Sequence, residues 1–247
     1  MAQPLRFQAT VAQVTRHTPD VVTYRLYADR RLPRFVPGQF IHLTMDAYDP
    51  AGFWPDSRVF SVANAVADRR TVELTISRQG AYTGKLLDQL QPGDQVWAKG
   101  PYGDFTIDAR HGFRRAVLIA GGTGVTPFCA FMDAALGQGA LPLDEAVLHY
   151  GAQTPELLIY KGLAERCAAT VPGFRACYYA EQRVDGAAVA SVQAGRIDLA
   201  GIMANSGDTQ DTGFYLSGPK VMINSFRDKL VQDYRLPDEQ ILIDAWE

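Results

Sequence analysis

Residues 5–107 carry short alternating runs of apolar and polar side chains that are separated by turn residues. Residues 21–27 are rich in β-forming side chains, and residues 71–77 alternate with a period of two. Pro-Gly pairs at 37–38 and 92–93 each precede a further run. Such runs between tight turns are typical of an antiparallel barrel or sandwich. Strands are expected at 7–14, 21–27, 39–45, 71–77 and 94–99, and one helix at 83–90.

After residue 113 the pattern changes to apolar strands that alternate with helices. Residues 116–120 form a continuous apolar run, as expected for a parallel strand buried on both faces. The order predicts a doubly wound α/β parallel sheet, whose ligands bind at the carboxyl ends of the strands. Further strands are expected at 146–150, 175–180, 213–217 and 240–245, and helices at 128–136, 156–166 and 222–234. The sequence therefore predicts two domains, an antiparallel β-barrel at residues 1–110 and the α/β domain at residues 111–247.

Composition excludes several classes of protein. Of the 247 residues, 47% are hydrophobic and 21% are charged, which is close to an ordinary globular domain and excludes disordered, collagen-like and coiled-coil chains. The three cysteines show no metal-binding spacing, so no metal site is expected. The N-terminus has no apolar run of signal-peptide length, and the longest uncharged stretch, 116–132, is interrupted by glycines and a proline. We therefore expect a cytoplasmic protein without a membrane span.

The charge is distributed unevenly along the chain. The net charge is −3, which argues against a nucleic-acid partner. Residues 1–110 carry 13 Lys and Arg against 11 Asp and Glu, whereas residues 111–247 carry 11 against 16. This asymmetry fits either an ordinary solvated surface or a mildly basic first half that meets an acidic partner.

Two segments of the first half carry residues suited to binding phosphate. Arg58-Val59-Phe60-Ser61 begins a barrel strand, although alone it also fits an edge strand with a surface arginine. Residues 80–86 open the barrel helix, and the free N–H groups of a helix N-terminus bind phosphate well. Thr83 is placed to cap that helix, which is also the ordinary structural reading of this segment.

Two segments of the second half lie at the ends of buried strands. Gly-Gly-Thr-Gly-Val-Thr-Pro at 121–127 lets the backbone approach a diphosphate closely, and a purely structural turn is the alternative. Tyr-Leu-Ser-Gly-Pro at 215–219 places Ser217 at a strand end. Ser217 has no nucleophile-elbow motif and no histidine in a triad context, so hydrolysis is disfavoured.

The order of these motifs resembles the ferredoxin–NADP reductase superfamily. Arg-x-Phe-Ser, Gly80 with Thr83, Gly-Pro-Tyr-Gly at 100–103 and the two strand-end segments follow one another as in that family, over about residues 5–247. The resemblance implies a flavin-binding barrel followed by a nicotinamide-nucleotide domain, the arrangement that the pattern also predicts. It implies FAD as the bound cofactor and NADH or NADPH as the electron donor.

The resemblance also assigns roles to individual residues. Arg58 is expected to pair with the flavin diphosphate, Phe60 to lie against the isoalloxazine ring, and Ser61 to hydrogen-bond near flavin N5. Further flavin contacts are expected from Thr75, Ile76, Ser77, Ala81, Tyr82 and Thr83. The nicotinamide nucleotide is expected to meet Gly122, Thr123, Thr126, Glu181, Arg196 and Gly218.

Three residues are expected to be catalytic: Ser61, Ser217 and Asp244. Ser217 stands where the family commonly has cysteine, and serine is less polarisable, so slower hydride transfer is expected. Trp246 stands where many members place a terminal aromatic that stacks on the flavin, the alternative being a buried C-terminal anchor.

The choice of nicotinamide coenzyme rests on the residues after two predicted strands. Positions that hold the 2′-phosphate in many NADPH users are Gln153 and Ala180-Glu181 here. A carboxylate repels phosphate and binds free ribose hydroxyls, which favours NADH. Arg183 and Arg196 lie nearby and argue the other way, so NADH is favoured and NADPH stays open.

The leading hypothesis is a flavin-dependent NAD(P)H reductase that passes electrons to a separate carrier, such as ferredoxin, flavodoxin or an oxygenase component. Steering of an acidic carrier is expected from Arg30, Arg31, Arg34, Arg78, Lys85 and Lys99. Loops at 47–57 and 203–212 are expected beside the site. A flavin reductase that releases reduced flavin, and a non-catalytic regulatory module, are the alternatives. We expect a monomer with no nucleic-acid or membrane partner.

Overall fold

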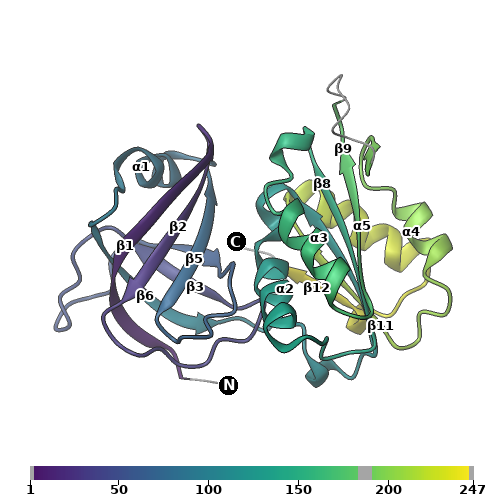
Figure 1. The fold of residues 1–247 in the computed structure, drawn as a ribbon, viewed down its shortest axis with the longest axis horizontal. Coiled ribbons are helices and arrows are strands. Elements are labelled where there is room, and N and C mark those ends of the chain that lie inside the picture. Colours follow the sequence, from purple (N-terminus) through teal and green to yellow (C-terminus); the bar gives the residue numbers. More distant parts are fainter. Residues whose placement is uncertain (1–2, 183–190, 245–247) are drawn as a thin grey trace. The chain divides into compact units, whose positions relative to one another are not determined.

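A computed structural model describes residues 3–182 and 191–244 of the chain (Figure 1). By its internal contacts the chain divides into two compact units. The first comprises Met1–Thr106 with Thr126–Ala134, and the second comprises Ile107–Val125 with Ala135–Glu247. No helix of the described segments is long and apolar enough to cross a membrane.

The first unit is built on a six-stranded antiparallel sheet in the order β4-β3-β6-β1-β2-β5. An isolated bridge pairs Val62, which follows β4, with Leu74 in the middle of β5, so the sheet nearly closes on itself. This confirms the predicted antiparallel barrel. The strands are β1 (Leu5–Thr18), β2 (Val21–Ala28), β3 (Phe40–Thr44), β4 (Arg58–Ser61), β5 (Thr71–Ser77) and β6 (Gln95–Tyr102).

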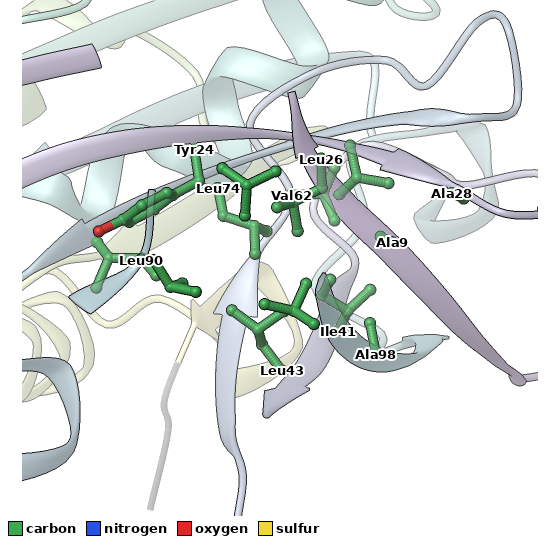
Figure 2. Packing of buried hydrophobic residues seen from close by; sticks show 14 of the residues in the cluster. Ala9, Tyr24, Leu26, Ala28, Ile41, Leu43, Val62, Leu74, Leu90 and Ala98 are labelled. Atoms are coloured by element: carbon green, nitrogen blue, oxygen red, sulfur yellow. The ribbon is translucent and has the colours of Figure 1, made fainter. Parts of the chain in front are cut away.

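Alternation along the strands decides which side chains fill the barrel. On β5, Val72, Leu74 and Ile76 are buried, whereas Thr71, Glu73 and Ser77 keep part of their exposure; Thr75 is also buried. Figure 2 shows apolar side chains of several strands, which lie far apart in the sequence, gathered in one interior. Removing this apolar surface from water, at about 25 cal/mol per Å², is the main stabilising contribution.

Helix α1 (Ala81–Gln89) begins two residues before the predicted start at residue 83. Gly80 is the N-cap, and the Thr83 hydroxyl accepts the backbone N–H groups of Gln79 at 2.8 Å and Gly80 at 3.2 Å. Thr83 is therefore the third residue of the helix and closes its first turn from inside, instead of capping it from the preceding position. Leu86 is fully buried and joins the helix to the barrel core.

The second unit is a six-stranded parallel sheet in the order β10-β9-β8-β7-β11-β12. Its strands are β7 (Arg115–Gly121), β8 (Glu145–Ala152), β9 (Phe174–Ala180), β10 (Val192–Ala194), β11 (Thr212–Ser217) and β12 (Ile241–Asp244). Its helices are α3 (Lys161–Thr170), α4 (Leu199–Asn205), α5 (Lys220–Gln232) and the end of α2 (Thr126–Gln138), whose residues 126–134 belong to the first unit. Helix α3 lies on one face of the sheet, and α4 and α5 lie on the other (Figure 1). The predicted doubly wound fold is confirmed.

The strand order of this sheet locates its ligand crevice. The chain runs from β7 outward to β8, β9 and β10, and then returns to β11 on the other side of β7. The order therefore reverses between β7 and β11. Ligands of open parallel sheets bind at the carboxyl ends of the strands, at such a reversal.

Two predictions of local structure differ from the observed elements, and two short elements were not predicted. The helix expected at 156–166 is instead a short 3-10 turn at Pro155–Leu157 followed by α3. The loop expected at 203–212 begins inside α4. Strand β10 and helix α4 have three and seven residues, too few for a hydrophobic period to predict them. Further 3-10 turns among the described residues are η1 (Ala109–His111), η2 (Gly122–Val125) and η5 (Asp238–Gln240).

Candidate functional site

The first candidate site lies where β4 begins, beside the first turn of α1. The Arg58 guanidinium carbon is 4.5 Å from the centre of the Tyr82 ring, which places the cation over the ring. The Tyr82 hydroxyl donates to the Leu43 carbonyl at 3.1 Å, and burial raises the pKa of this hydroxyl, so it stays protonated. The Tyr82 ring is thereby fixed to β3, and Arg58 rests on it.

The helix end beside Arg58 has donors to offer. Within the described residues, the N–H groups of Ala81, Tyr82 and Thr83 meet no acceptor, as is usual for the first turn of a helix. A guanidinium next to free N–H groups and the positive end of a helix dipole is suited to phosphate. The predicted residues Arg58, Ala81, Tyr82 and Thr83 are thus brought together in the structure.

Asp56 contacts the predicted site, although the sequence did not single it out. Arg58 donates to the Asp56 carboxylate at 2.6 Å and to the Ser57 carbonyl at 2.9 Å. The two charged side chains are 47% and 67% exposed, so water weakens their attraction. A diphosphate, which carries two negative charges, can therefore displace Asp56 from Arg58 and take over the cation.

The remaining barrel predictions lie on β4 and β5. Phe60 is half-buried and packs against the barrel core, and Ser61 is buried at the end of β4. The Thr75 hydroxyl hydrogen-bonds to Thr23 at 2.8 Å. The Ile76 side chain is buried inside the barrel, so only its backbone can meet a ligand.

Strand β5 is the last strand in the order of the sheet. The backbone of such an edge strand can pair with a planar ring that both donates and accepts hydrogen bonds. The predicted residue Ser77 is the last residue of this strand, and its hydroxyl accepts the Gln79 side-chain amide at 3.0 Å.

The second candidate site is formed by two glycine turns at the carboxyl ends of β7 and β11. A Cβ atom on Gly124 would lie 2.5 Å from the Cα and N atoms of Gly218. Gly122 and Gly218 have φ angles of 57° and 148°, in a region that favours glycine. The absence of side chains at these glycines therefore allows the two turns to pack closely.

The turns meet where the strand order reverses, since Ala120 and Ser217 are partners in the register of β7 and β11. Backbone N–H groups of such turns form concavities that bind diphosphates. The predicted residues Thr123 and Thr126 lie in η2 and at the start of α2.

Ser217 and Asp244, both predicted as catalytic, are joined by a hydrogen bond. The Ser217 hydroxyl donates to the Asp244 carboxylate at 3.0 Å, and both residues are buried. They are register partners at the ends of β11 and β12. Because the serine proton is directed to the carboxylate, the serine oxygen is held in one orientation at the start of the Gly218 turn.

An ion pair joins Glu181 and Arg196 at the carboxyl end of β9. From the sequence, Glu181 favours NADH and Arg196 favours NADPH. The distance from Arg196 Nε to Glu181 Oε2 is 3.0 Å. Backbone hydrogen bonds from Glu181 to Ala152 at 3.1 Å and from Gly195 to Ala180 at 2.7 Å hold both segments in place. Arg183 and Trp246 lie outside the described residues.

Several of the cations predicted to steer a carrier are already engaged. Arg78 bridges Asp20 at 2.9 Å and Asp88 at 2.6 Å. Arg30 pairs with Asp29 at 3.1 Å, Lys85 lies 3.7 Å from Asp46, and Lys99 lies over the Trp54 ring at 5.0 Å. The positive electrostatic field of the barrel is therefore weaker than a count of its basic residues suggests.

Comparison with protein families matches both halves of the chain. The oxidoreductase FAD-binding domain matches residues 8–107, and the oxidoreductase NAD-binding domain matches residues 118–228. The chain belongs to the ferredoxin reductase-like family. Its cofactors are therefore FAD and a nicotinamide nucleotide, as the sequence predicted.

One curated relative aligns with most of the chain. The ferredoxin–NAD(+) reductase component of the alkene monooxygenase system of Xanthobacter autotrophicus is 32% identical over 215 residues, covering 86% of this chain and 62% of that protein. The chain thus spans less than two thirds of that relative.

The solved structure of the cytochrome P450 reductase GcoB of Amycolatopsis is 26% identical, with a TM-score of 0.80 over 99% of this chain and 70% of the other. A ferredoxin NADP+ reductase from Neisseria gonorrhoeae, solved with FAD and NADP, shares the fold with a TM-score of 0.73 over 99% of both chains, at 20% identity.

Proposed function

We propose that this chain is a flavoprotein reductase that takes hydride from NADH and passes electrons to a separate carrier, either ferredoxin, flavodoxin or an oxygenase component. The observation that carries the proposal is that one chain holds two arrangements suited to phosphate, Arg58 beside the first turn of α1 and Gly124 packed against Gly218. Relatives that act as reductase components of monooxygenase systems support it.

In the barrel, the residues of the chain bind and orient the flavin. Arg58 and the N–H groups of the first turn of α1 would hold its phosphates, while Phe60 would cover the ring and Ser61 would hydrogen-bond to it. When bound, FAD supplies the chemistry, since it accepts a hydride and returns electrons one at a time, which no side chain can do. The barrel is rigid because its strands close on a filled apolar core, so these contacts need little reorganisation.

In the second unit, the glycine turns would hold the coenzyme diphosphate. Ser217 would contact the nicotinamide, and its buried bond to Asp244 fixes the orientation of the hydroxyl. We also propose NADH as the preferred coenzyme, because Glu181 already neutralises Arg196, the cation best placed for a 2′-phosphate. We place the boundary between the two domains near residue 110 and expect a monomer.

A visible spectrum of the purified protein tests the proposal. We expect a yellow protein with bound FAD that is bleached by one equivalent of NADH in the absence of oxygen and recovers when ferredoxin is added. A colourless protein that binds no added flavin would overturn the proposal and indicate a regulatory module on this fold.

A second candidate function is a flavin reductase that releases reduced flavin. The pairing of Arg58 with Asp56 favours it, because a neighbouring carboxylate competes with the flavin phosphates for the same cation. Gel filtration after reduction by NADH distinguishes the two, since only this second function predicts that the flavin leaves the protein.

A further inference from the structure

One face of the parallel sheet is incompletely covered beneath α4. Parallel sheets normally carry helices over both faces. Here α4 has only seven residues, and Val147 on β8 and Cys177 on β9 keep part of their exposure although they lie on interior strands. A hollow of about 530 Å³ opens between these strands and α4, which we call the α4 hollow. Its volume is in the range of about 300–1,000 Å³ found for small-molecule sites.

One part of the α4 hollow is polar and uncharged. His149 and Tyr179, which are 8% and 5% exposed, line it, and His149 Nδ1 hydrogen-bonds to the Tyr179 hydroxyl at 3.0 Å. Burial lowers the pKa of His149 to about 4 and raises that of Tyr179 to about 12, so both are neutral at pH 7. In the part of the chain that the structure describes, no hydrogen bond engages His149 Nε2. This nitrogen is therefore left for a ligand.

Another part of the α4 hollow is apolar, and its rim is polar and charged. Val117, Val147 and Ile202 form the apolar part, while Gln193, Asp198, Asn205 and Ser206 add polar or acidic groups. At the rim, Arg175 pairs with Glu145, and Arg115 donates to backbone carbonyls of the segment after α4. These cations are engaged within the chain, so the rim offers little to attract an anionic ligand.

A second polar group of the α4 hollow also lacks a partner. Thr212 lines the hollow, is 2% exposed, and its hydroxyl has no hydrogen-bond partner among the residues that the structure describes. Buried polar groups are normally satisfied, and an unsatisfied one needs an explanation such as a missing ligand. Thr212 and His149 come from different strands and both border the same hollow.

We propose that the α4 hollow binds an uncharged, flat and mainly apolar small molecule that carries one hydrogen-bonding group, of about the size of phenol. Its ring would lie against Val117, Val147 and Ile202, and its hydrogen-bonding group would meet His149 Nε2. A charged ligand is disfavoured because burying an unpaired charge costs far more than burying a hydroxyl. The site is separate from the glycine turns after β7 and β11, since on β7 and β8 it is lined by first and middle residues, although on β9 it reaches Tyr179 near the carboxyl end.

The test is a titration of the ¹⁵N-labelled, flavin-loaded protein with phenol, observing the imidazole nitrogens by NMR. We expect a saturable shift of His149 Nε2 with a dissociation constant on the order of 1 mM. Toluene should bind about three to ten times more weakly, the value of one neutral hydrogen bond. Benzoate, the charged counterpart, should not bind.

Variants connect the titration to the hollow. Cys177→Phe fills the hollow and should abolish phenol binding, and Val147→Phe serves the same purpose if the first variant does not fold. His111→Phe, in η1 and not among the residues that line the hollow, is the control and should leave the titration unchanged.

Absence of a saturable His149 shift up to 20 mM phenol (about twenty times the expected constant), equal binding of toluene and phenol, or an unchanged titration in the filled variants would each overturn the proposal. None of these results depends on reductase activity, so failure here is distinguishable from failure of the proposed function.

Discussion

A methyl group at Gly124 tests whether close packing of the two strand-end turns builds the nucleotide site. In Gly124→Ala the new Cβ would lie 2.5 Å from the Cα and N atoms of Gly218 and 2.6 Å from the carbonyl carbon of Ser217. All three are backbone atoms at the end of a buried strand. They cannot turn aside as the tip of a flexible side chain can.

The magnitude follows from these distances. Non-bonded carbon atoms prefer separations of about 3.5–4.0 Å, so the two turns must move apart by about 1 Å. Overpacking of this kind typically costs about 1–3 kcal/mol of unfolding free energy. The displacement falls on the backbone that would hold the diphosphate, so we expect NADH affinity to fall by at least about tenfold, equivalent to about 1.4 kcal/mol.

The assay combines urea unfolding, followed by circular dichroism, with NADH binding to the flavin-loaded protein. FAD binding should be unchanged, because Arg58 and α1 belong to the barrel. Gly162→Ala is the matched control: it lies in α3, a Cβ there meets no atom within 4 Å, and alanine should stabilise the helix by about 0.5–1 kcal/mol. If Gly124→Ala keeps both the stability and the NADH affinity of the wild type, the reasoning is wrong.

Three further predictions concern single side chains. Asp56→Asn should tighten FAD binding about threefold to tenfold in a fluorescence titration, because it frees Arg58, whereas Asp49→Asn on the same loop should not. Ser217→Ala should lower the rate of flavin reduction by NADH in stopped-flow measurements, while NADH affinity changes little. Since burial lowers the pKa of His149 to about 4, the folded state binds fewer protons than the unfolded state between about pH 4 and 6.5. Stability should therefore fall as the pH drops through this window, and His149→Gln should flatten the fall in urea unfolding curves.

The barrel strands are the part of the fold that the sequence predicts best. The predicted strand at 71–77 coincides with β5, because only every second side chain enters the barrel and the period is visible in the sequence. The helix predicted at 156–166 is displaced from α3 for a physical reason. Leu158 is buried although it precedes α3. This apolar position fits a helical period but belongs to the turn before the helix. A local pattern cannot distinguish these two origins of burial.

The site could be predicted residue by residue but not as a set of contacts. Ser217 and Asp244 were each recognised from a motif or a position, yet their hydrogen bond depends on β11 and β12 being neighbours in register. Asp56 carries no signal in the sequence, because a carboxylate two residues from an arginine is common. Its relevance appears only when the Tyr82 ring is seen to hold Arg58 beside the helix end.

The coenzyme preference shows how a contact changes the interpretation of a sequence. In the sequence, Glu181 favours NADH and Arg196 favours NADPH. In the structure the two side chains form one ion pair and are 41% and 83% exposed. An exposed pair of this kind contributes about 0–1 kcal/mol, so a 2′-phosphate can draw Arg196 away from Glu181 at small cost. We therefore expect a modest preference for NADH, of about tenfold in kcat/KM.

Glu181→Gln removes both the competitor for Arg196 and the repulsion of the phosphate, so it should raise kcat/KM for NADPH by about tenfold while that for NADH falls through loss of a ribose contact. The matched control is Glu181→Gln combined with Arg196→Gln, which should lose the gain for NADPH because the freed cation is gone. A wild-type preference for NADH above about a thousandfold, which is about 4 kcal/mol, exceeds what this ion pair can supply. That result would assign coenzyme selection to residues other than Glu181 and Arg196.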